Sequence, residues 1–122
     1  MKKLAIASVL GLLLACVVSA QKVGGYKEVN TSDATVHEAA QFAASAQGEK
    51  IDRTIKLIAI HKAEMQVVAG RNYRMCLKVE STGGEDEADA IFTVVAVVYV
   101  DLKGNKKLTN WEPTDCGDDD DD

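Results

Sequence analysis

The sequence contains few of the residues from which catalytic and metal sites are built. It has two histidines, His37 and His61, and three cysteines among 122 residues. Isolated histidines and distant cysteines match no metal-ligand spacing. A Cys–His pair would also need an orienting group and an oxyanion site, and the spacing suggests neither. We therefore expect a protein that is not an enzyme and that has no metal or cofactor.

The chain also lacks an excess of positive charge and, after its first 20 residues, any long apolar run. Its formal net charge is −5. An acidic protein is a poor partner for nucleic acid or an anionic membrane. A transmembrane helix needs roughly 20 apolar residues, and no segment supplies them. We expect neither nucleic-acid binding nor a transmembrane segment.

The first 20 residues have the pattern of a secretory signal peptide. Lys2 and Lys3 precede an apolar run, and Ser19 and Ala20 are small residues suited to cleavage before Gln21. This pattern predicts a secreted protein. Loss of the two lysines with the signal would change the formal charge from −5 to −7.

The same segment allows a second interpretation. Leu13, Leu14, Ala15 and Cys16 are similar to a bacterial lipobox, in which Cys16 would carry the lipid. That interpretation predicts a bacterial protein that is periplasmic or held to a membrane through Cys16.

The mature chain is expected to form one domain, residues 21–116, followed by an acidic tail, residues 117–122. The tail contains five consecutive aspartates, Asp118 to Asp122. A run of like charges repels itself and stays solvated. We therefore expect a disordered tail.

The domain has the pattern of one helix followed by several strands. Small apolar residues recur at helical spacing between Val36 and Ala46. Capping side chains are available at residues 31–33, and Gln47 and Gly48 are expected to end the helix. Strands are expected at residues 26–30, 54–65, 71–80, 91–100 and 108–113. The pattern predicts an α+β fold, with one N-terminal helix packed on a four- to five-stranded antiparallel sheet.

Two of the strands differ in their apolar pattern. In residues 71–80, Tyr73, Met75 and Leu77 alternate with polar residues, which predicts one buried and one solvated face. Residues 91–100 are apolar almost throughout, which predicts a central strand covered on both faces. A polar connection, residues 81–89, joins them.

An apolar hairpin tip joins the first two long strands. It consists of Gln66, Val67, Val68, Ala69 and Gly70. Hairpin tips usually carry turn-forming residues such as Asn-Gly, because water surrounds them and the backbone needs positive φ angles. Apolar residues at an exposed tip indicate insertion into the groove of a partner.

This tip resembles the Gln-x-Val-x-Gly loop of the cystatins, which inhibit papain-like cysteine proteases. Gln66, Val68 and Gly70 occupy the matching positions, and Val67 and Ala69 fill the variable ones. The resemblance extends over roughly residues 23–113. Val23, Gly24 and Gly25 resemble the N-terminal trunk of the family, and residues 39–43 resemble the face of its helix.

The resemblance implies inhibition by occlusion of a protease active-site cleft. In an up-and-down sheet, the loop at residues 66–70 and the turn at residues 101–107 lie at the same end, and the trunk arrives there too. Val23 would occupy an apolar subsite, and Gly24 would turn the chain away before the catalytic thiol. Reversible inhibition of papain-like or cathepsin L-like proteases is therefore expected.

The second turn departs from the family pattern. Many cystatins carry Pro-Trp there, whereas this chain has Leu102, Lys103 and Gly104. The turn looks polar and basic, so we expect the trunk and the first hairpin to dominate binding. The family's legumain-binding variants have an asparagine after the helix, and residues 49–52 contain none. Legumain binding is therefore not predicted.

Cys76 and Cys116 remain after signal removal and allow one disulfide in an oxidising compartment. Their strands are not expected to be neighbours. Cys116, however, follows Pro113, and a tail crossing the outer face of the sheet could reach Cys76. The sequence leaves this bridge open.

Two alternatives concern function and assembly. The absence of Pro-Trp allows a cystatin-like binding module without protease inhibition. We expect a monomer, and a strained apolar hairpin also allows a domain-swapped dimer.

Overall fold

The structure is a computed structural model that describes residues 25–85 and 87–117. The proposed signal peptide with Cys16, the trunk residues Val23 and Gly24, and the aspartate tail lie outside these residues. The described elements are β1 (Lys27–Glu28), α2 (Ala34–Ile51), β2 (Thr54–Val68), β3 (Gly70–Thr82), β4 (Ala90–Val100) and β5 (Lys106–Pro113).

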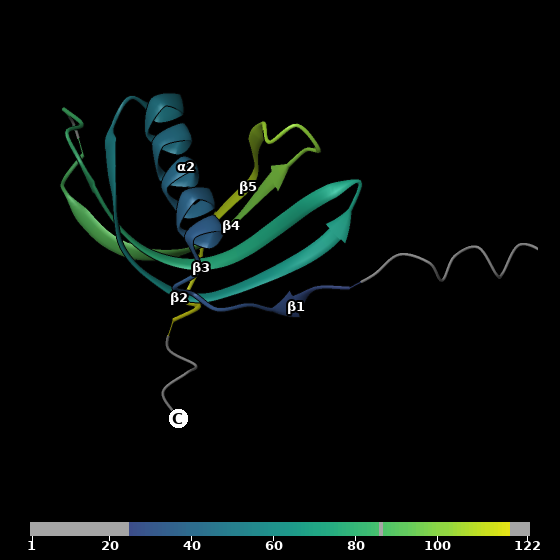
Figure 1. Ribbon diagram of the computed structural model, residues 1–122. Coiled ribbons are helices and arrows are strands. Elements are labelled where there is room, and N and C mark those ends of the chain that lie inside the picture. Colours follow the sequence, from purple (N-terminus) through teal and green to yellow (C-terminus); the bar gives the residue numbers. More distant parts are fainter. Residues whose placement is uncertain (1–24, 86, 118–122) are drawn as a thin grey trace, which may run out of the picture.

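The strands form one antiparallel sheet in sequence order, β1-β2-β3-β4-β5. The helix α2 lies across one face of this curved sheet (Figure 1). The predicted α+β architecture is confirmed, with five strands rather than four. Its consecutive antiparallel strands place alternate turns at opposite ends of the sheet.

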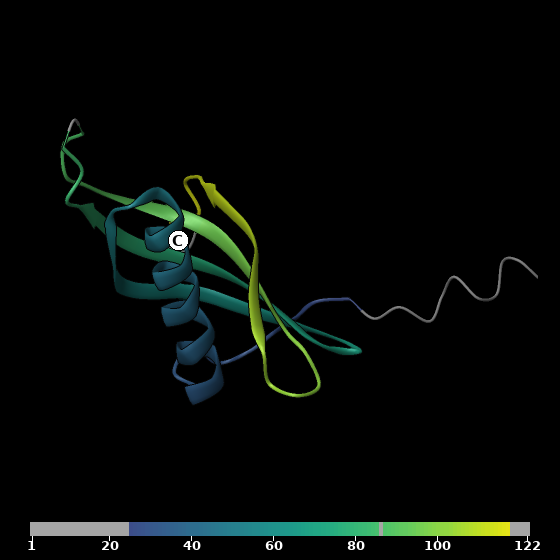
Figure 2. The ribbon, with the colours of Figure 1, turned by 90° about the horizontal axis from the view of Figure 1, so that it is seen from above.

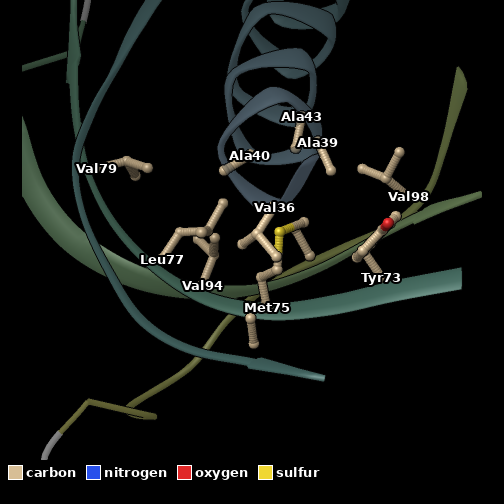
Figure 3. Close-up of a cluster of buried hydrophobic side chains, with 12 residues drawn as sticks. Val36, Ala39, Ala40, Ala43, Tyr73, Met75, Leu77, Val79, Val94 and Val98 are labelled. Carbon is tan, nitrogen blue, oxygen red and sulfur yellow. The ribbon is translucent and has the colours of Figure 1, made fainter. Parts of the chain in front are cut away.

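The core lies between α2 and the sheet. The helix contributes Val36 and three alanines, Ala39, Ala40 and Ala43, and none of the alanines is exposed. Their small side chains let the helix approach the larger residues of β3 and β4 (Figure 3). Those larger residues are Tyr73, Met75, Leu77, Val79, Val94 and Val98. Burying each large apolar side chain contributes about 1.5–3 kcal/mol, which fixes the strand register.

The helix ends later than predicted. Gly48 was expected to end it, but α2 continues to Ile51, and Asp52 adopts the left-handed conformation with φ of 61°. A Cβ atom on Gly48 would lie 2.7 Å from the carbonyl oxygen of Arg53. Gly48 therefore serves close packing inside the helix, and Asp52 provides the terminating conformation.

The predicted cap at the start of the helix is also wrong in detail. Asp33 is the N-cap residue, but its side chain makes no capping hydrogen bond. The side chain of Asn30 instead accepts hydrogen bonds from the backbone and the hydroxyl of Ser32, at 2.9 and 2.8 Å. The polar residues organise the turn before the helix rather than its first N–H groups.

β4 is not covered on both faces as its apolar sequence predicted. It lies between β3 and β5, and β3 is the middle strand. Val94, Ala96 and Val98 face α2 and are fully buried, whereas Val95 and Val97 on the other face are half-buried. The outer face of the sheet receives partial cover from the segment after β5.

That segment is held by backbone contacts and by a disulfide. After Pro113, Thr114 donates its N–H to the carbonyl of Thr93 at 3.0 Å. Cys116 then forms a disulfide with Cys76, with 6.0 Å between the two Cα atoms. The bridge that the sequence left open is present because the chain leaves the edge strand and crosses the outer face.

Candidate functional site

The two hairpin loops lie at the same end of the sheet (Figures 1 and 2). In the first hairpin, Gln66 pairs with Asn72, Val67 with Arg71, and Val68 with Gly70. The hairpin is thus tighter than the predicted five-residue tip, and pairing continues almost to Ala69. Arg71 also pairs with Val100, the last residue of β4, which places the second loop beside the first.

Three large apolar side chains are exposed on these loops. Val67 is 63 % exposed, Val68 39 % and Leu102 81 %. We call these three residues the apolar loop edge. Leu102 is the most exposed large apolar residue of the described chain. The prediction of a polar turn was wrong for Leu102, because the neighbouring lysine and glycine dominate the local composition.

Gly70 fixes the first loop against the second hairpin. Its φ angle is +109°, which disfavours residues with side chains. A Cβ atom there would collide with the carbonyl oxygen of Val100 and lie 2.9 Å from the Tyr99 hydroxyl. Glycine is needed here for backbone angle and for close approach, so this position couples the two loops.

Tyr99 makes the second link between the hairpins, and sequence reasoning missed it. Its hydroxyl donates a hydrogen bond to the carbonyl of Ala69. Beside it, the Asn72 side-chain amide donates to the Gln66 side-chain oxygen at 3.0 Å. Tyr99 pairs with Asn72 across the strands. Knowledge of this register would have identified Tyr99, because a tyrosine opposite a residue of the first hairpin can reach the loop of that hairpin.

The second loop holds its own shape. The Asp101 carboxylate accepts hydrogen bonds from the backbone N–H groups of Lys103 and Asn105, each at 2.9 Å. These bonds, the one from Asn105 first, lower the pKa of Asp101 from its ordinary value of 3.8. Gly104 has a φ angle of +92° and donates to the Asp101 carbonyl. The turn therefore presents Leu102 on an ordered backbone.

The segment before α2 lies along the edge of β2. Lys27 pairs with Met65 and Glu28 with Glu64, so β1 is antiparallel to β2 and its first residue lies nearer the hairpin tip. Of the three predicted trunk residues, Gly25 alone is described, and it is exposed with open space around it. The Arg74 guanidinium stacks 4.0 Å from the centre of the Tyr26 ring.

Neither a Cys–His dyad nor a group of metal-ligand type is formed by the described residues. Cys76 is in the disulfide and offers no thiol to His61. Within residues 25–85 and 87–117, no three His, Cys, Asp or Glu side chains group as metal ligands would. The same part of the chain contains no helix that is both long and apolar enough to cross a membrane.

The sequence is similar to those of known proteinase inhibitors. Residues 27–113 match the family model described as aspartic acid proteinase inhibitor. "Cysteine proteinase inhibitor 5" of Arabidopsis thaliana is 32 % identical over 102 residues, which are 81 % of this chain and 79 % of that protein. "L-cystatin" of Tachypleus tridentatus is 38 % identical over 73 residues, or 58 % of this chain. The match spans 55 % of that relative.

A solved structure shows the same fold. The salivary cystatin of the soft tick Ornithodoros moubata superposes with a TM-score of 0.61 and 27 % identity, over 75 % of this chain and 97 % of that one. By sequence and fold, the chain is thus similar to proteinase inhibitors. The chain belongs to the cystatin family. The aspartic acid proteinase inhibitor model matches its residues 27–113.

Proposed function

We propose that this protein is a reversible, tight-binding inhibitor of papain-like cysteine proteases. The observation that carries the proposal is the apolar loop edge, Val67, Val68 and Leu102, on two hairpins that are tied to one another. Exposed apolar side chains gathered at one end of a domain favour docking into a groove. The names of the relatives, cystatin and cysteine proteinase inhibitor, indicate the class of protease.

In this proposal three segments enter the active-site cleft together. The first segment is the trunk, Val23, Gly24 and Gly25, of which Val23 would occupy an apolar subsite. The first loop contributes Gln66, Val67, Val68, Ala69 and Gly70, and the second contributes Leu102, Lys103 and Gly104. The trunk would turn away at Gly24 before it reaches the catalytic thiol. No peptide bond would be presented for attack, so the inhibitor would leave the complex uncleaved.

The loops are ordered before binding, which favours affinity. Gly70 packs on β4, Tyr99 holds Ala69, and Asp101 holds the second turn. A loop that is already ordered loses less conformational freedom when a partner binds. The entropic cost that is avoided is about 0.5–1.5 kcal/mol for each side chain that need not be immobilised. Binding energy is expected to concentrate in the valines of the first loop, with a smaller part from Leu102.

The localisation in this proposal is extracellular. The charge and apolar pattern of residues 1–20 support signal-directed secretion, and one disulfide suits an oxidising compartment. Residues 21–116 would form the monomeric inhibitor domain.

A second candidate target is an aspartic protease. It is favoured by the description of the matching family model, aspartic acid proteinase inhibitor, whose span begins at residue 27. That span leaves out the trunk. Inhibition of an aspartic protease would therefore depend on the sheet and its loops, without Val23 and Gly24.

A titration of three proteases by the secreted protein tests the proposal. Papain, a cathepsin L-like enzyme and pepsin would each be assayed with a fluorogenic peptide. We expect reversible inhibition of the first two at nanomolar concentration and an inhibitor that stays uncleaved. Gly24→Glu should weaken this inhibition, because a charged side chain would meet the protease at the bend. Inhibition of pepsin alone would support the second candidate, and inhibition of none at micromolar concentration would leave a binding module of cystatin fold.

A further inference from the structure

We propose that Arg74 is the positioning residue of the inhibitory trunk. It acts through Tyr26, which follows Gly25 directly, and not by touching the protease. This inference rests on the proposed function, because it concerns how the trunk is oriented for the cleft. It assigns a role to a contact on the outer face of the sheet that neither the loop motif nor the core explains.

The trunk needs such a contact because β1, the strand that follows it, forms few hydrogen-bonded pairs with the sheet. β1 has two residue pairs with β2, and one further backbone bond follows, from the N–H of Val29 to the carbonyl of Ala63 at 2.9 Å. One of the two pairs sets Glu28 opposite Glu64. Like charges directly opposite one another in a sheet are destabilising.

Arg74 offsets both weaknesses. Its Nε donates to the Glu64 carboxylate at 2.9 Å. The positive charge of Arg74 thereby compensates the negative charge of Glu64, which lies opposite Glu28. The same guanidinium stacks over the Tyr26 ring at 4.0 Å. The hydrogen bond to Glu64 fixes the plane of the guanidinium, and a fixed plane is what stacking on an aromatic ring requires.

The contact matters for β1 more than for the neighbouring hairpin. β2 and β3 pair from Thr54 to Val68 and are also held by the core. Their pairing therefore does not depend on the single ion pair between Arg74 and Glu64. Neither residue of β1 is buried, and the chain beside it is held by Val29 on the core side and by Tyr26 on Arg74. Arg74 therefore holds Tyr26, the residue next to the trunk, in a fixed position.

A double-mutant cycle with Tyr26→Ala and Arg74→Ala tests this role in the protein purified after secretion of the full chain. Dissociation from papain would be followed by stopped-flow fluorescence. Arg74→Ala should raise the dissociation rate about fivefold. The same change in the Tyr26→Ala background should have a clearly smaller effect. Tyr26→Phe keeps the ring and should retain the wild-type rate, while Arg74→Lys loses the planar stack and should not.

Lys78→Ala is the matched control, because Lys78 is a cation on the same face of β3 and is not near Tyr26. It should leave the dissociation rate unchanged. Equal effects of Arg74→Ala in both backgrounds would overturn the proposal, and so would an effect of Lys78→Ala as large as that of Arg74→Ala.

A second readout needs no protease and separates this inference from the proposed function. Amide exchange of Val29 in the free protein reports the pairing of β1 with β2. Arg74→Ala should speed it about fivefold while exchange at Leu77 in the core stays the same. Unchanged exchange at Val29 would refute the role of Arg74 even if papain is inhibited. Faster exchange without any papain inhibition would support the contact and refute the target.

Discussion

The two ends of the sheet differ in whether their side chains form contacts within the chain or remain exposed to solvent. At one end, which we call the Arg53 end, the Arg53 side chain is 7 % exposed. It donates to the hydroxyl of Ser81 at 2.6 Å, to the Ser81 carbonyl at 3.1 Å and to the Ala88 carbonyl at 3.3 Å. At the other end, the loop end, polar groups fix the loop backbones and leave Val67, Val68 and Leu102 in solvent.

This difference separates stability from recognition. At the Arg53 end, polar contacts join the turn after α2 to the end of β3 and to the connection that follows it, and the arginine side chain has its partners within the chain. The loop end also has internal contacts, but they order the backbone beneath the exposed side chains. We therefore expect changes at the Arg53 end to lower stability and changes to the apolar loop edge to lower binding.

The largest expected effect is that of Val67→Asp at the loop end. A charged side chain in an apolar part of the interface should weaken papain inhibition about 100-fold, or ~2.7 kcal/mol. Thermal unfolding should be unchanged, because Val67 is 63 % exposed. The measurement is the inhibition constant together with the melting temperature.

The matched control for this change is Ile91→Asp. Ile91 is 58 % exposed, close to Val67, but it lies at the start of β4, away from the loops. It should keep full inhibition. Equal losses in the two variants would mean that the loop edge has no special role.

Arg53→Ala should have the reverse effect. Ser81 is buried, and removal of the guanidinium would leave its polar groups without this partner. We expect the free energy of unfolding to fall by about 2 kcal/mol, measured by urea denaturation. The inhibition constant at 25 °C should stay within twofold of wild type. A folded Arg53→Ala protein that no longer inhibits would contradict the division between the two ends.

Leu102 should contribute less than the valines. Leu102→Ser is expected to weaken inhibition about fivefold, because one exposed leucine loses about 1 kcal/mol of apolar burial in the complex. Leu102→Trp should strengthen inhibition, since a larger aromatic side chain buries more area at the same position. Both inhibition constants would be compared with that of Lys107→Ala, a control at an exposed residue of β5 outside the proposed contact residues. Weaker inhibition by the tryptophan variant would show that this loop does not enter an apolar site.

The smallest expected effect is the response of the second loop to acid. The folded pKa of Asp101 lies below its ordinary value of 3.8, so the ionised form stabilises the loop at neutral pH. That contribution should be lost as the pH falls below 3.8 through the folded pKa. The amide NMR shifts of Lys103 and Asn105 should follow this titration and stay flat in Asp101→Ala. A midpoint above 3.8 would show that the hydrogen bonds do not stabilise the carboxylate.

Much of the fold could be predicted from local patterns. Tyr73, Met75 and Leu77 alternate with polar residues, and all three are buried as that period requires. The alanines of α2 fit the helical period in the same way. The end of the helix could not be predicted from Gly48. A glycine is needed there because the Arg53 carbonyl, in the turn after the helix, lies too close for a side chain.

The loop motif could be recognised in the sequence, whereas the contacts that hold the loop and the trunk in place could not. The apolar residues of the first loop were found because they violate the usual composition of a hairpin tip. The hydrogen bond from Tyr99 to Ala69 and the stacking of Arg74 on Tyr26 each join a strand residue to a residue just outside another strand. Such contacts depend on strand register, which in β2 is shifted by irregularities near Ala59 and Lys62. Composition and spacing along the chain do not contain that information.

Amide hydrogen exchange of the protein, free and bound to papain, would show which end of the sheet the protease covers. Both ends of the sheet are observed in one experiment. We expect slower exchange in the complex at residues 66–70 and 101–105, with no change at Arg53, Thr54 and residues 83–85. Protection at the Arg53 end, with the loop end unchanged, would show that the loops are not the surface that binds the protease.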